Sequence, residues 1–313
     1  MRNRKIVVTG GAGFVGSHVV KALCDKGYEV TVIDDLSFGY RSFVDPRACF
    51  IEGRIQDKKI LNKVLPGAEA VIHLAALSII KFSYQNPLEY FENNVTGGVL
   101  LLESMRKHKV KKMIFSSSAA VYGEPKNVPI PEDAAKEPIN PYGASKLAFE
   151  NILTSYYHSF GIESVSLRFF NAYGPRDEQT PATRAVPVWI KAIIYGKPVP
   201  LYWNGKQKRD YVYVSDVAEA HLAALKLSGL HFINIGYGKG VVMKNLVNLL
   251  EKLIGKRALI VKKGVRWGDP PVLVADISKA KKVMNWHPKV DFEEGLKETV
   301  RYYLEQGEKR KDG

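Results

Sequence analysis

The chain has 313 residues, of which 46% are hydrophobic and 25% are charged, as in a globular protein with a sizeable buried core. No apolar stretch approaches the roughly 18 residues that cross a bilayer, and no signal-like apolar run follows the basic N-terminus. The two cysteines lack metal-ligand spacing. We therefore expect a cytoplasmic protein without membrane contact or metal. The net charge of +14 is spread along the chain without interleaved aromatic residues, so we expect no specific nucleic-acid partner.

The first half of the chain alternates segments with strand and helix patterns. In chain order we expect a strand at Lys5–Thr9, a helix at Phe14–Lys26, strands at Tyr28–Ile33 and Ala48–Glu52, a helix at Asp57–Leu65, a strand at Ala70–Leu74, a helix at Pro87–His108, a strand at Lys112–Ser116, a helix at Pro141–Phe160 and a strand at Ser164–Phe169. Repeated units of this kind predict an α/β fold with a doubly wound parallel sheet.

The regular alternation ends beyond Asn171. Loops rich in proline and glycine, such as Gly174-Pro175 and Gly196-Lys197-Pro198, separate shorter segments there. We expect residues 171–208 and 237–313 to form a smaller C-terminal α/β region that binds the substrate. Residues 1–170, with a returning segment at about 209–236, would form the cofactor-binding domain.

A glycine-rich sequence joins the first strand to the first helix. Gly10, Gly13 and Gly16 are spaced three apart, and glycines here allow a tight turn, a close approach of the backbone to a pyrophosphate, and close packing of helix on strand. The second strand ends at Asp34, whose carboxylate can accept hydrogen bonds from a ribose and would repel a 2′-phosphate. Asp35 follows directly, and we place the ribose on Asp34. These features predict a Rossmann-type domain that binds NAD.

Three residues form a candidate catalytic set. Tyr142 and Lys146 are four apart, so they share a face at the start of a predicted helix. A lysine ammonium stabilises a phenolate, and a tyrosine base at pH 7 needs a pKa shift of about three units. Ser118 follows a strand at the edge of the sheet where ligands bind, and it could relay a proton to Tyr142. Taken alone, Ser118 could belong to a serine-rich turn, and Tyr142 and Lys146 could be a chance pair on an exposed helix.

Together these motifs resemble the extended short-chain dehydrogenase/reductase superfamily and, within it, the UDP-glucose 4-epimerase group. The resemblance runs from Ile6 to about Leu296. It rests, in this order, on Thr9–Ser17, Asp34–Ser37, His73–Ala76, Asn93–Val95, Ser116–Gly123, Pro141–Lys146, Arg168–Pro175, Arg209–Tyr211 and Arg266–Asp269. Together, in this order, the motifs are highly specific for the superfamily and moderately specific for the UDP-glucose 4-epimerase group.

The resemblance implies NAD as the cofactor, a UDP-sugar as the substrate, and Ser118, Tyr142 and Lys146 as the catalytic residues. The cofactor site would comprise Gly10, Gly13, Phe14, Val15, Gly16, Asp34, Asp35, Leu36, Ser37, Gly39, Ile55, Leu74, Ala75, Ala76, Asn93, Ser116, Tyr142, Lys146 and Phe170. The substrate site would comprise Ser118, Tyr142, Asn171, Arg184, Leu201, Tyr202, Arg209, Arg266 and Asp269. Arg209 and Arg266 would neutralise the diphosphate, and Asp269 would bind the uridine ribose.

The reaction implied by the resemblance is a reversible oxidation at C4 of the sugar. Tyr142, as a phenolate, removes the 4-hydroxyl proton while hydride passes to NAD, and a transient 4-keto sugar then accepts hydride on its other face. Related dehydratases and UDP-glucuronate decarboxylases carry a glutamate where this chain has Ala120. Because alanine transfers no proton, the epimerase interpretation is favoured.

Other residues leave alternatives open. Arg184 occupies a position where decarboxylases use arginine, so a UDP-glucuronate decarboxylase is the main alternative. Leu273 replaces a bulky aromatic residue of the epimerase group, so the sugar could be a plain hexose, an N-acetylated hexose or a uronic acid. Arg54 replaces an aspartate that contacts adenine in the group. A non-catalytic sensor on the same fold is a further class, against which the complete catalytic set argues.

A homodimer is also expected. The helices Pro87–His108 and Pro141–Phe160 resemble those that form a four-helix dimer interface in the superfamily. Leu100, Leu101 and Leu102 form an unbroken apolar stretch, which is more than one buried helix face requires. Ordinary packing within the core is the alternative, and we expect a two-fold symmetric dimer.

Overall fold

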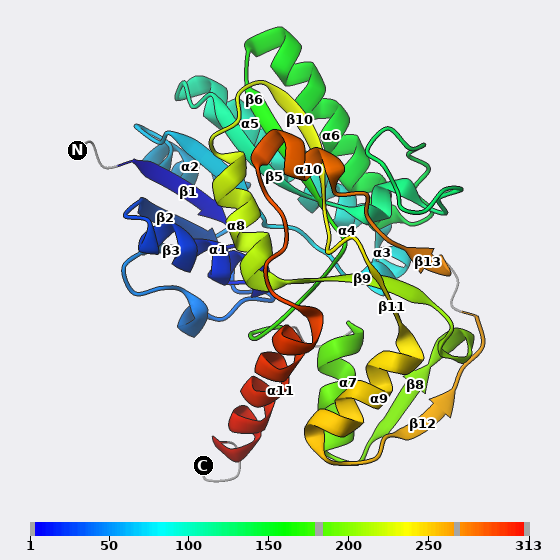
Figure 1. Ribbon diagram of the computed structural model, residues 1–313. Helices are drawn as coiled ribbons and strands as arrows, with labels where there is room; N and C mark the ends of the chain where they lie inside the picture. The colour runs from blue at the N-terminus through cyan, green and yellow to red at the C-terminus, as the bar shows by residue number, and fades with distance from the viewer. Residues whose placement is uncertain (1–3, 179–183, 266–269, 310–313) are drawn as a thin grey trace.

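The computed structural model describes residues 4–178, 184–265 and 270–309. Its centre is a seven-stranded parallel sheet with the strand order β10-β6-β5-β4-β1-β2-β3 (Figure 1). The strands are β1 (Lys5–Thr9), β2 (Glu29–Asp34), β3 (Cys49–Glu52), β4 (Ala70–His73), β5 (Lys112–Ser118), β6 (Glu163–Phe169) and β10 (Leu230–Ile235). The order reverses between β1 and β4, which confirms the predicted doubly wound fold and places a ligand crevice at that point.

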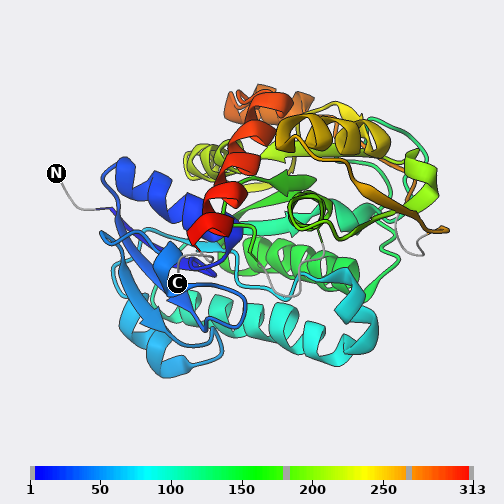
Figure 2. The ribbon, with the colours of Figure 1, turned by 90° about the horizontal axis from the view of Figure 1, so that it is seen from below.

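Alternate residues of the central strands face two separate cores. Ile6 and Val8 face α1 (Phe14–Asp25), α8 (Val214–Ala224) and α10 (Ser278–Met284). Val7 and Val71 face α2 (Lys58–Val64), α5 (Gly97–Lys107) and α6 (Pro141–Phe160). Helices therefore cover both sides of the sheet, as the second view shows (Figure 2). Burial on both faces explains why these strands are continuous apolar runs in the sequence.

A third core lies beyond the carboxyl ends of the sheet. It packs α7 (Ala185–Ile194), α9 (Met243–Ile254) and α11 (Phe292–Lys309) against short strands. These strands are β7 (Asn171–Tyr173), β9 (Lys208–Tyr213), β11 (Gly240–Val242) and β8 (Pro198–Leu201). Strand β13 (Val272–Leu273) also pairs with β9, and β12 (Leu259–Lys262) pairs with β8. This core forms a second packed region beyond the sheet, and both its predicted role in substrate binding and its predicted boundaries stay predictions.

The prediction of one continuous α-helix at Pro87–His108 was wrong, because a wider helical segment interrupts it. The chain forms α4 (Pro87–Phe91), a π-helical segment Glu92–Thr96, and then α5. Within the wide segment, the Asn94 side chain accepts a hydrogen bond from the Leu77 N–H at 2.9 Å and donates to the Leu77 carbonyl and the Ser145 hydroxyl at 3.0 Å. These bonds to the loop after β4 explain the local widening, and such segments are frequent at functional sites.

Helix α6 begins and ends as the sequence predicts. The Asn140 side chain accepts the Gly143 N–H at 2.7 Å, and Pro141 occupies the first turn, where its missing N–H costs nothing. Gly161 ends the helix in the left-handed conformation with φ 62°. This fixed start places Tyr142 in the first turn of α6, next to the carboxyl end of β5.

Candidate active site

A cleft with a volume of about 1190 Å³ opens between the carboxyl ends of the central strands and the third core. This volume exceeds the ~300–1,000 Å³ of common small-molecule sites, so the cleft has room for two ligands. Every described residue of the predicted cofactor and substrate sites lines it, except Leu36 and Leu201. Arg266 and Asp269 lie outside the described residues.

Leu36 and Leu201 support the cleft from behind. The Leu36 side chain packs against the core next to α1, and its backbone N–H donates to the Asp34 carboxylate at 2.9 Å. Leu201 is 4% exposed within the third core, and its carbonyl accepts the Lys263 N–H at 2.9 Å. Sequence position alone could not distinguish lining residues from the core residues beside them. Leu273 also packs against a core, that of Ala119–Tyr122, and it does not line the cleft.

The glycine-rich loop leaves room only for glycine at two of its positions. A Cβ on Gly10, whose φ is +73°, would lie 2.5 Å from the Ala75 nitrogen, and one on Gly16 would lie 2.0 Å from the Gly10 oxygen. Helix α1 begins after Gly13 without a side-chain cap, so its first N–H groups stay available for an anion. This geometry fits the pyrophosphate of a dinucleotide.

The predicted ribose ligand, Asp34, also holds this loop in place. One carboxylate oxygen of Asp34 accepts the Ala12 N–H at 2.9 Å, and the other accepts the Leu36 N–H at 2.9 Å. Burial raises the pKa of Asp34, while these two hydrogen bonds act in the opposite direction. Each oxygen keeps a second lone pair, and the side chain lines the cleft. The geometry is compatible with a ribose diol.

The neighbouring carboxylate, Asp35, is engaged elsewhere. It accepts the Ser37 N–H at 3.0 Å and the Ser37 hydroxyl at 2.6 Å, and its second oxygen lies 3.3 Å from Nε of Arg54. The arginine that replaces the adenine-contacting aspartate of the epimerase group therefore compensates the Asp35 charge at the rim of the cleft.

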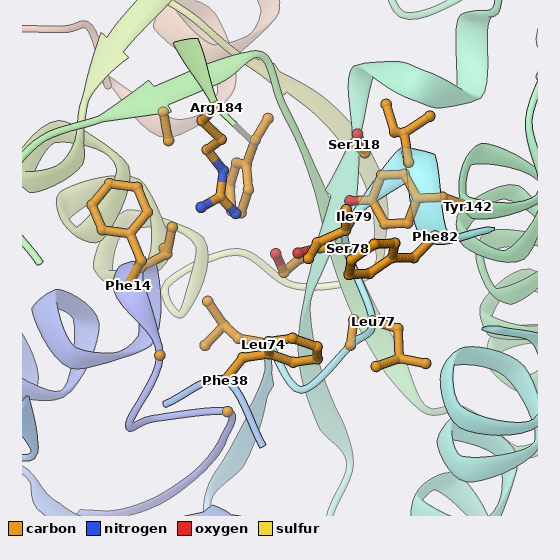
Figure 3. Close-up of a pocket in the computed structure, with 18 of the residues that line it drawn as sticks. Phe14, Phe38, Leu74, Leu77, Ser78, Ile79, Phe82, Ser118, Tyr142 and Arg184 are labelled. Atoms are coloured by element: carbon orange, nitrogen blue, oxygen red, sulfur yellow. The ribbon is translucent and has the colours of Figure 1, made fainter. Parts of the chain in front are cut away.

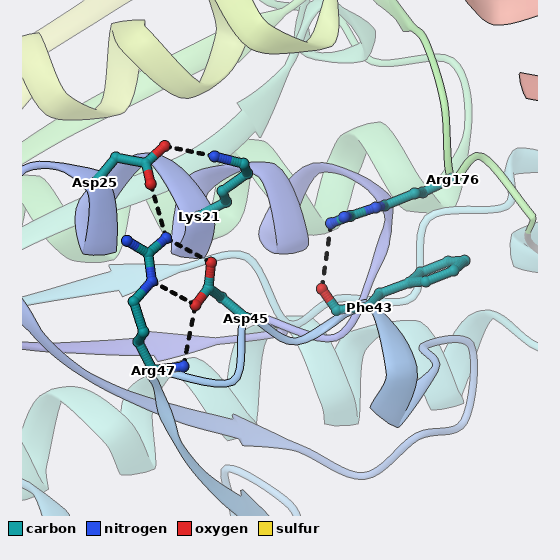
Figure 4. A network of polar contacts seen from close by, with 6 residues as sticks. All are labelled: Lys21, Asp25, Phe43, Asp45, Arg47 and Arg176. Atoms are coloured by element: carbon teal, nitrogen blue, oxygen red, sulfur yellow. Dashed lines mark hydrogen bonds and ion pairs between the residues drawn. The ribbon is translucent and has the colours of Figure 1, made fainter.

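Polar contacts fix both sides of the loop between β2 and β3, which borders the cleft near Asp34 (Figure 4). Arg47 reaches Asp25 of α1 at 2.7 Å and binds Asp45 at 2.7 Å. On the other side, Arg176 donates to the Phe43 carbonyl at 3.2 Å, which joins segments far apart in the sequence. Arg176 and Phe43 both line the cleft. The Arg176 contact therefore joins this loop to the segment after β7 at the edge of the cleft.

The predicted catalytic residues all line the other end of the cleft, where Figure 3 shows Ser118 beside Tyr142. The Tyr142 phenol interacts with the Ser118 side chain, which also accepts the Ala120 N–H at 3.1 Å. Lys146 donates from Nζ to the Ser116 carbonyl at 2.7 Å, and Nζ lies 5.9 Å from the centre of the Tyr142 ring. The structure thus brings the three side chains together as the spacing predicts.

Burial opposes the charged forms of both Tyr142 and Lys146. It raises the pKa of the Tyr142 phenol, although Ser118 and the Arg184 charge act to lower it. It lowers the pKa of Lys146 to about 7, although Glu150 acts to raise it. A phenolate at neutral pH therefore requires further positive charge in the cleft, which a bound nicotinamide ring would provide.

Arg184 reaches into the cleft opposite Tyr142 (Figure 3). Its guanidinium carbon lies 5.6 Å from the ring centre of Phe14, and it forms an ion pair with the buried carboxylate of Asp177. Arg209 is 6% exposed and donates to the carbonyls of Lys208 at 2.9 Å and Pro271 at 3.3 Å. Two arginines held from behind in this way suit the recognition of an anionic ligand.

One wall of the cleft was not expected from the sequence. It is formed by the loop after β4, by α3 (Ile80–Gln85) and by α4, and it includes Leu77, Ser78, Ile79, Phe82 and Tyr90. The Tyr90 ring stands edge-on to Tyr142 with 6.5 Å between centroids, and its hydroxyl donates to the Ile79 carbonyl at 2.6 Å. Burial raises the pKa of Tyr90 to about 12. The one feature of the sequence that could have indicated this wall is the position of residues 77–90 after a predicted strand of the central sheet.

Two further classes of site are absent from the described part of the chain. No group of histidine, cysteine, aspartate and glutamate side chains there is arranged to hold a metal ion. No helix within the same residues has the length and apolar character to cross a bilayer.

Comparison with known proteins gives consistent relatives. The model of the NAD dependent epimerase/dehydratase family matches residues 6–236. A UDP-glucose 4-epimerase of Lacticaseibacillus casei is 39% identical, covering 94% of this chain and 95% of that protein. A UDP-glucose 4-epimerase of Thermotoga maritima, solved with UDP-glucose, is 38% identical with a TM-score of 0.93, covering 96% of this chain and 99% of that one. A UDP-N-acetylglucosamine 4-epimerase of Methanobrevibacter ruminantium, solved with UDP-N-acetylmuramic acid, is 36% identical with a TM-score of 0.92, covering 98% and 100%.

Proposed function

The chain belongs to the NAD dependent epimerase/dehydratase family, and we propose that it is an NAD-dependent UDP-sugar 4-epimerase. The observation that carries the proposal is the position of Tyr142, next to Ser118 and Lys146, in the same cleft as the glycine-rich loop. Relatives named as UDP-glucose 4-epimerases match nearly the whole chain, which supports the same activity.

Bound NAD would supply the acceptor for the hydrogen on C4 of the sugar and would return it to either face. Tyr142 would take the proton of the 4-hydroxyl group, and Ser118 would hold that hydroxyl in line with the phenol. Lys146, as an ammonium above the Tyr142 ring, would stabilise the phenolate. The wall that includes Ile79, Phe82 and Tyr90 would keep water away from these groups.

The nucleotide part of the substrate would lie between the sheet and the third core. Arg184 and Arg209 would face the diphosphate, Asn171 would contact the phosphates, and Tyr202 would stack on the uracil. All four line the cleft. Arg266 and Asp269 remain proposed ligands of the diphosphate and the uridine ribose.

The loop after β5 argues for epimerisation over its related reactions. Ser118 is followed by Ala119 and Ala120, which form a 3-10 helix (Ala119–Tyr122) beside the phenol. Neither side chain can donate or accept a proton, so elimination of water or loss of carbon dioxide from the oxidised sugar would lack a proton-transfer group there. A reaction that ends with hydride return fits this loop best.

We also propose a homodimer formed by α4, α5 and α6. Leu88 is 68% exposed and Phe91 is 38% exposed on α4, so an apolar strip remains uncovered in the single chain. Of the three consecutive leucines, Leu101 and Leu102 lie in the core, while Leu100 is partly exposed. A second copy that buries this strip would explain it.

The test is to follow the purified protein by NMR with UDP-glucose, UDP-N-acetylglucosamine and UDP-glucuronate in turn. Interconversion at C4 is the expected result, and it would identify the sugar. Tyr142→Phe should abolish turnover, whereas Tyr156→Phe, on the same helix but bonded to Glu103 away from the cleft, should not. Formation of UDP-xylose would replace the proposal with a decarboxylase.

A further inference from the structure

The last three residues of β5 each contact a different residue of α6. The Ser118 side chain interacts with Tyr142, the Ser116 carbonyl accepts a hydrogen bond from Lys146 at 2.7 Å, and the Ser117 hydroxyl donates to Glu150 at 2.6 Å. Tyr142, Lys146 and Glu150 are four residues apart, so they lie on one face of the helix. The proposed reaction uses the first two members of this series and leaves Ser117 and Glu150 without a role.

Glu150 is fixed rigidly beneath the cleft. It is 1% exposed, and its carboxylate accepts two hydrogen bonds from Arg168, one from Nε at 3.0 Å and one from a terminal nitrogen at 2.7 Å. Arg168 is the register partner of Ser117 on the neighbouring strand. Its other terminal nitrogen donates to the Tyr122 hydroxyl at 2.8 Å and the Glu132 carbonyl at 3.0 Å. The carboxylate therefore has one orientation, set from two strands.

Stability alone does not explain this pair. Removing two charges from water costs several kcal/mol per ion, and apolar residues of similar volume often replace a buried ion pair without loss of stability. Both side chains of the pair are 2% exposed. A charge pair buried directly under a proposed catalytic lysine suggests that its electric field matters for Lys146.

The other ionisable groups around Lys146 carry no negative charge near neutral pH. On β4, burial lowers the pKa of His73 to about 3, so its ring is neutral. On α4, Tyr90, with its pKa raised to about 12, is also neutral. Arg168 on β6 lies behind the carboxylate, and Arg184 faces Tyr142 from across the cleft. Among these groups, Glu150 is the anion that favours a protonated Lys146.

We propose that Glu150 is a positioning residue that acts through Lys146: held by Ser117 and Arg168, its carboxylate keeps the lysine as an ammonium beside Tyr142. This inference rests on the proposed function of Tyr142 and Lys146. Loss of the carboxylate would let Lys146 lose its proton at lower pH. The alkaline limb of the pH profile, where Lys146 loses its proton, would therefore move to lower pH, and the pH range of activity would narrow from that side.

The test compares Glu150→Gln with Glu150→Gln/Arg168→Gln, which leaves no unpaired charge in the core. Glu163→Gln is the control, because it removes a carboxylate that pairs with Lys112 at the opposite end of β5. In Glu150→Gln we expect kcat to fall about tenfold near neutral pH and the alkaline limb of its pH profile to move to lower pH by about one unit, while KM for the UDP-sugar stays within about twofold. The double variant should shift in the same direction by less, and the control should match the unaltered protein.

A second measurement does not depend on turnover. The lysine side chains of each protein, labelled with carbon-13 at Cε, are titrated by NMR, and the same titration with Lys146→Met identifies the Lys146 signal. The Lys146 ammonium should lose its proton about one pH unit lower in Glu150→Gln. If the double variant keeps the original pH profile and the original Lys146 titration, Glu150 has only a structural role and the inference is overturned. Absence of epimerase activity in the unaltered protein would instead refute the proposed function, and the titration would still decide this inference.

Discussion

The Asp34 carboxylate accepts a hydrogen bond from the backbone N–H of Ala12 at 2.9 Å. This bond ties the end of β2 to the glycine-rich loop, so the residue proposed to bind the adenosine ribose also shapes the loop proposed to bind the pyrophosphate. Loss of either partner would disturb both ends of the proposed cofactor site together.

Asp34→Asn should weaken NAD binding by tenfold or more. An asparagine amide turns one acceptor into a donor, so either Ala12 or Leu36 would lose its partner. Asp35→Asn should have a smaller effect, because that carboxylate is compensated by Arg54 and Ser37 at the rim. Calorimetric titration of the cofactor-free proteins with NAD measures both. Equal losses, or a larger loss at Asp35, would contradict the assignment of the ribose to Asp34.

Gly16→Ala should destabilise the protein by about 3 kcal/mol and abolish NAD binding. The added methyl group would lie 2.0 Å from the Gly10 oxygen, and only a backbone shift can relieve that contact. Gly264→Ala is the matched control, because a Cβ there meets open space. Urea unfolding of both variants gives the difference. Unchanged stability in Gly16→Ala would mean that helix and loop are less closely packed than the structure shows.

The local geometry of the cleft that could be predicted from the sequence depends on short-range spacing. Gly10, Gly13 and Gly16 follow a strand and open a helix, and that context settles their geometry. Tyr142 and Lys146 share a face because a capped helix begins at Pro141. The parallel order of the central sheet follows in the same way from repeated strand–helix units.

The parts that could not be predicted depend on contacts between distant segments. Asn94 widens its helix because the loop at Leu77 and the side chain at Ser145 offer hydrogen bonds. The cleft wall at Ile79–Tyr90 and the core position of Leu201 are set by packing against other elements. The Arg168 charge likewise gives no signal until β6 is placed beside β5, where it meets Glu150.

Lys146→Met should abolish activity and stabilise the cofactor-free protein at low pH. The folded-state pKa of Lys146 is about 7 against an ordinary value of 10.5. Below pH 7 both folded and unfolded chains carry the proton, so the cost of burying the ammonium is fully present. Between these two values the unfolded chain binds the proton and the folded chain does not, so the cost declines as pH rises.

We therefore expect Lys146→Met to gain about 2 kcal/mol at pH 6 and almost nothing near pH 10. Lys107→Met removes an exposed lysine and should show no such pH dependence. Urea unfolding at several pH values measures the difference. A gain that stays constant with pH would show that it comes from packing of the methionine rather than from the buried charge.

Leu88→Glu with Phe91→Glu should convert the proposed dimer into a monomer. Both residues expose apolar surface on the same side of α4, and two charges per subunit would have to be buried in an interface formed by that helix. Sedimentation velocity should give the mass of two chains for the unaltered protein and of one chain for the double variant. Leu259→Glu, at a position 58% exposed on β12, should leave the dimer intact. If the double variant sediments like the unaltered protein, the subunits associate through another surface or not at all. If Leu259→Glu alone dissociates the dimer, the interface lies on the side of β12.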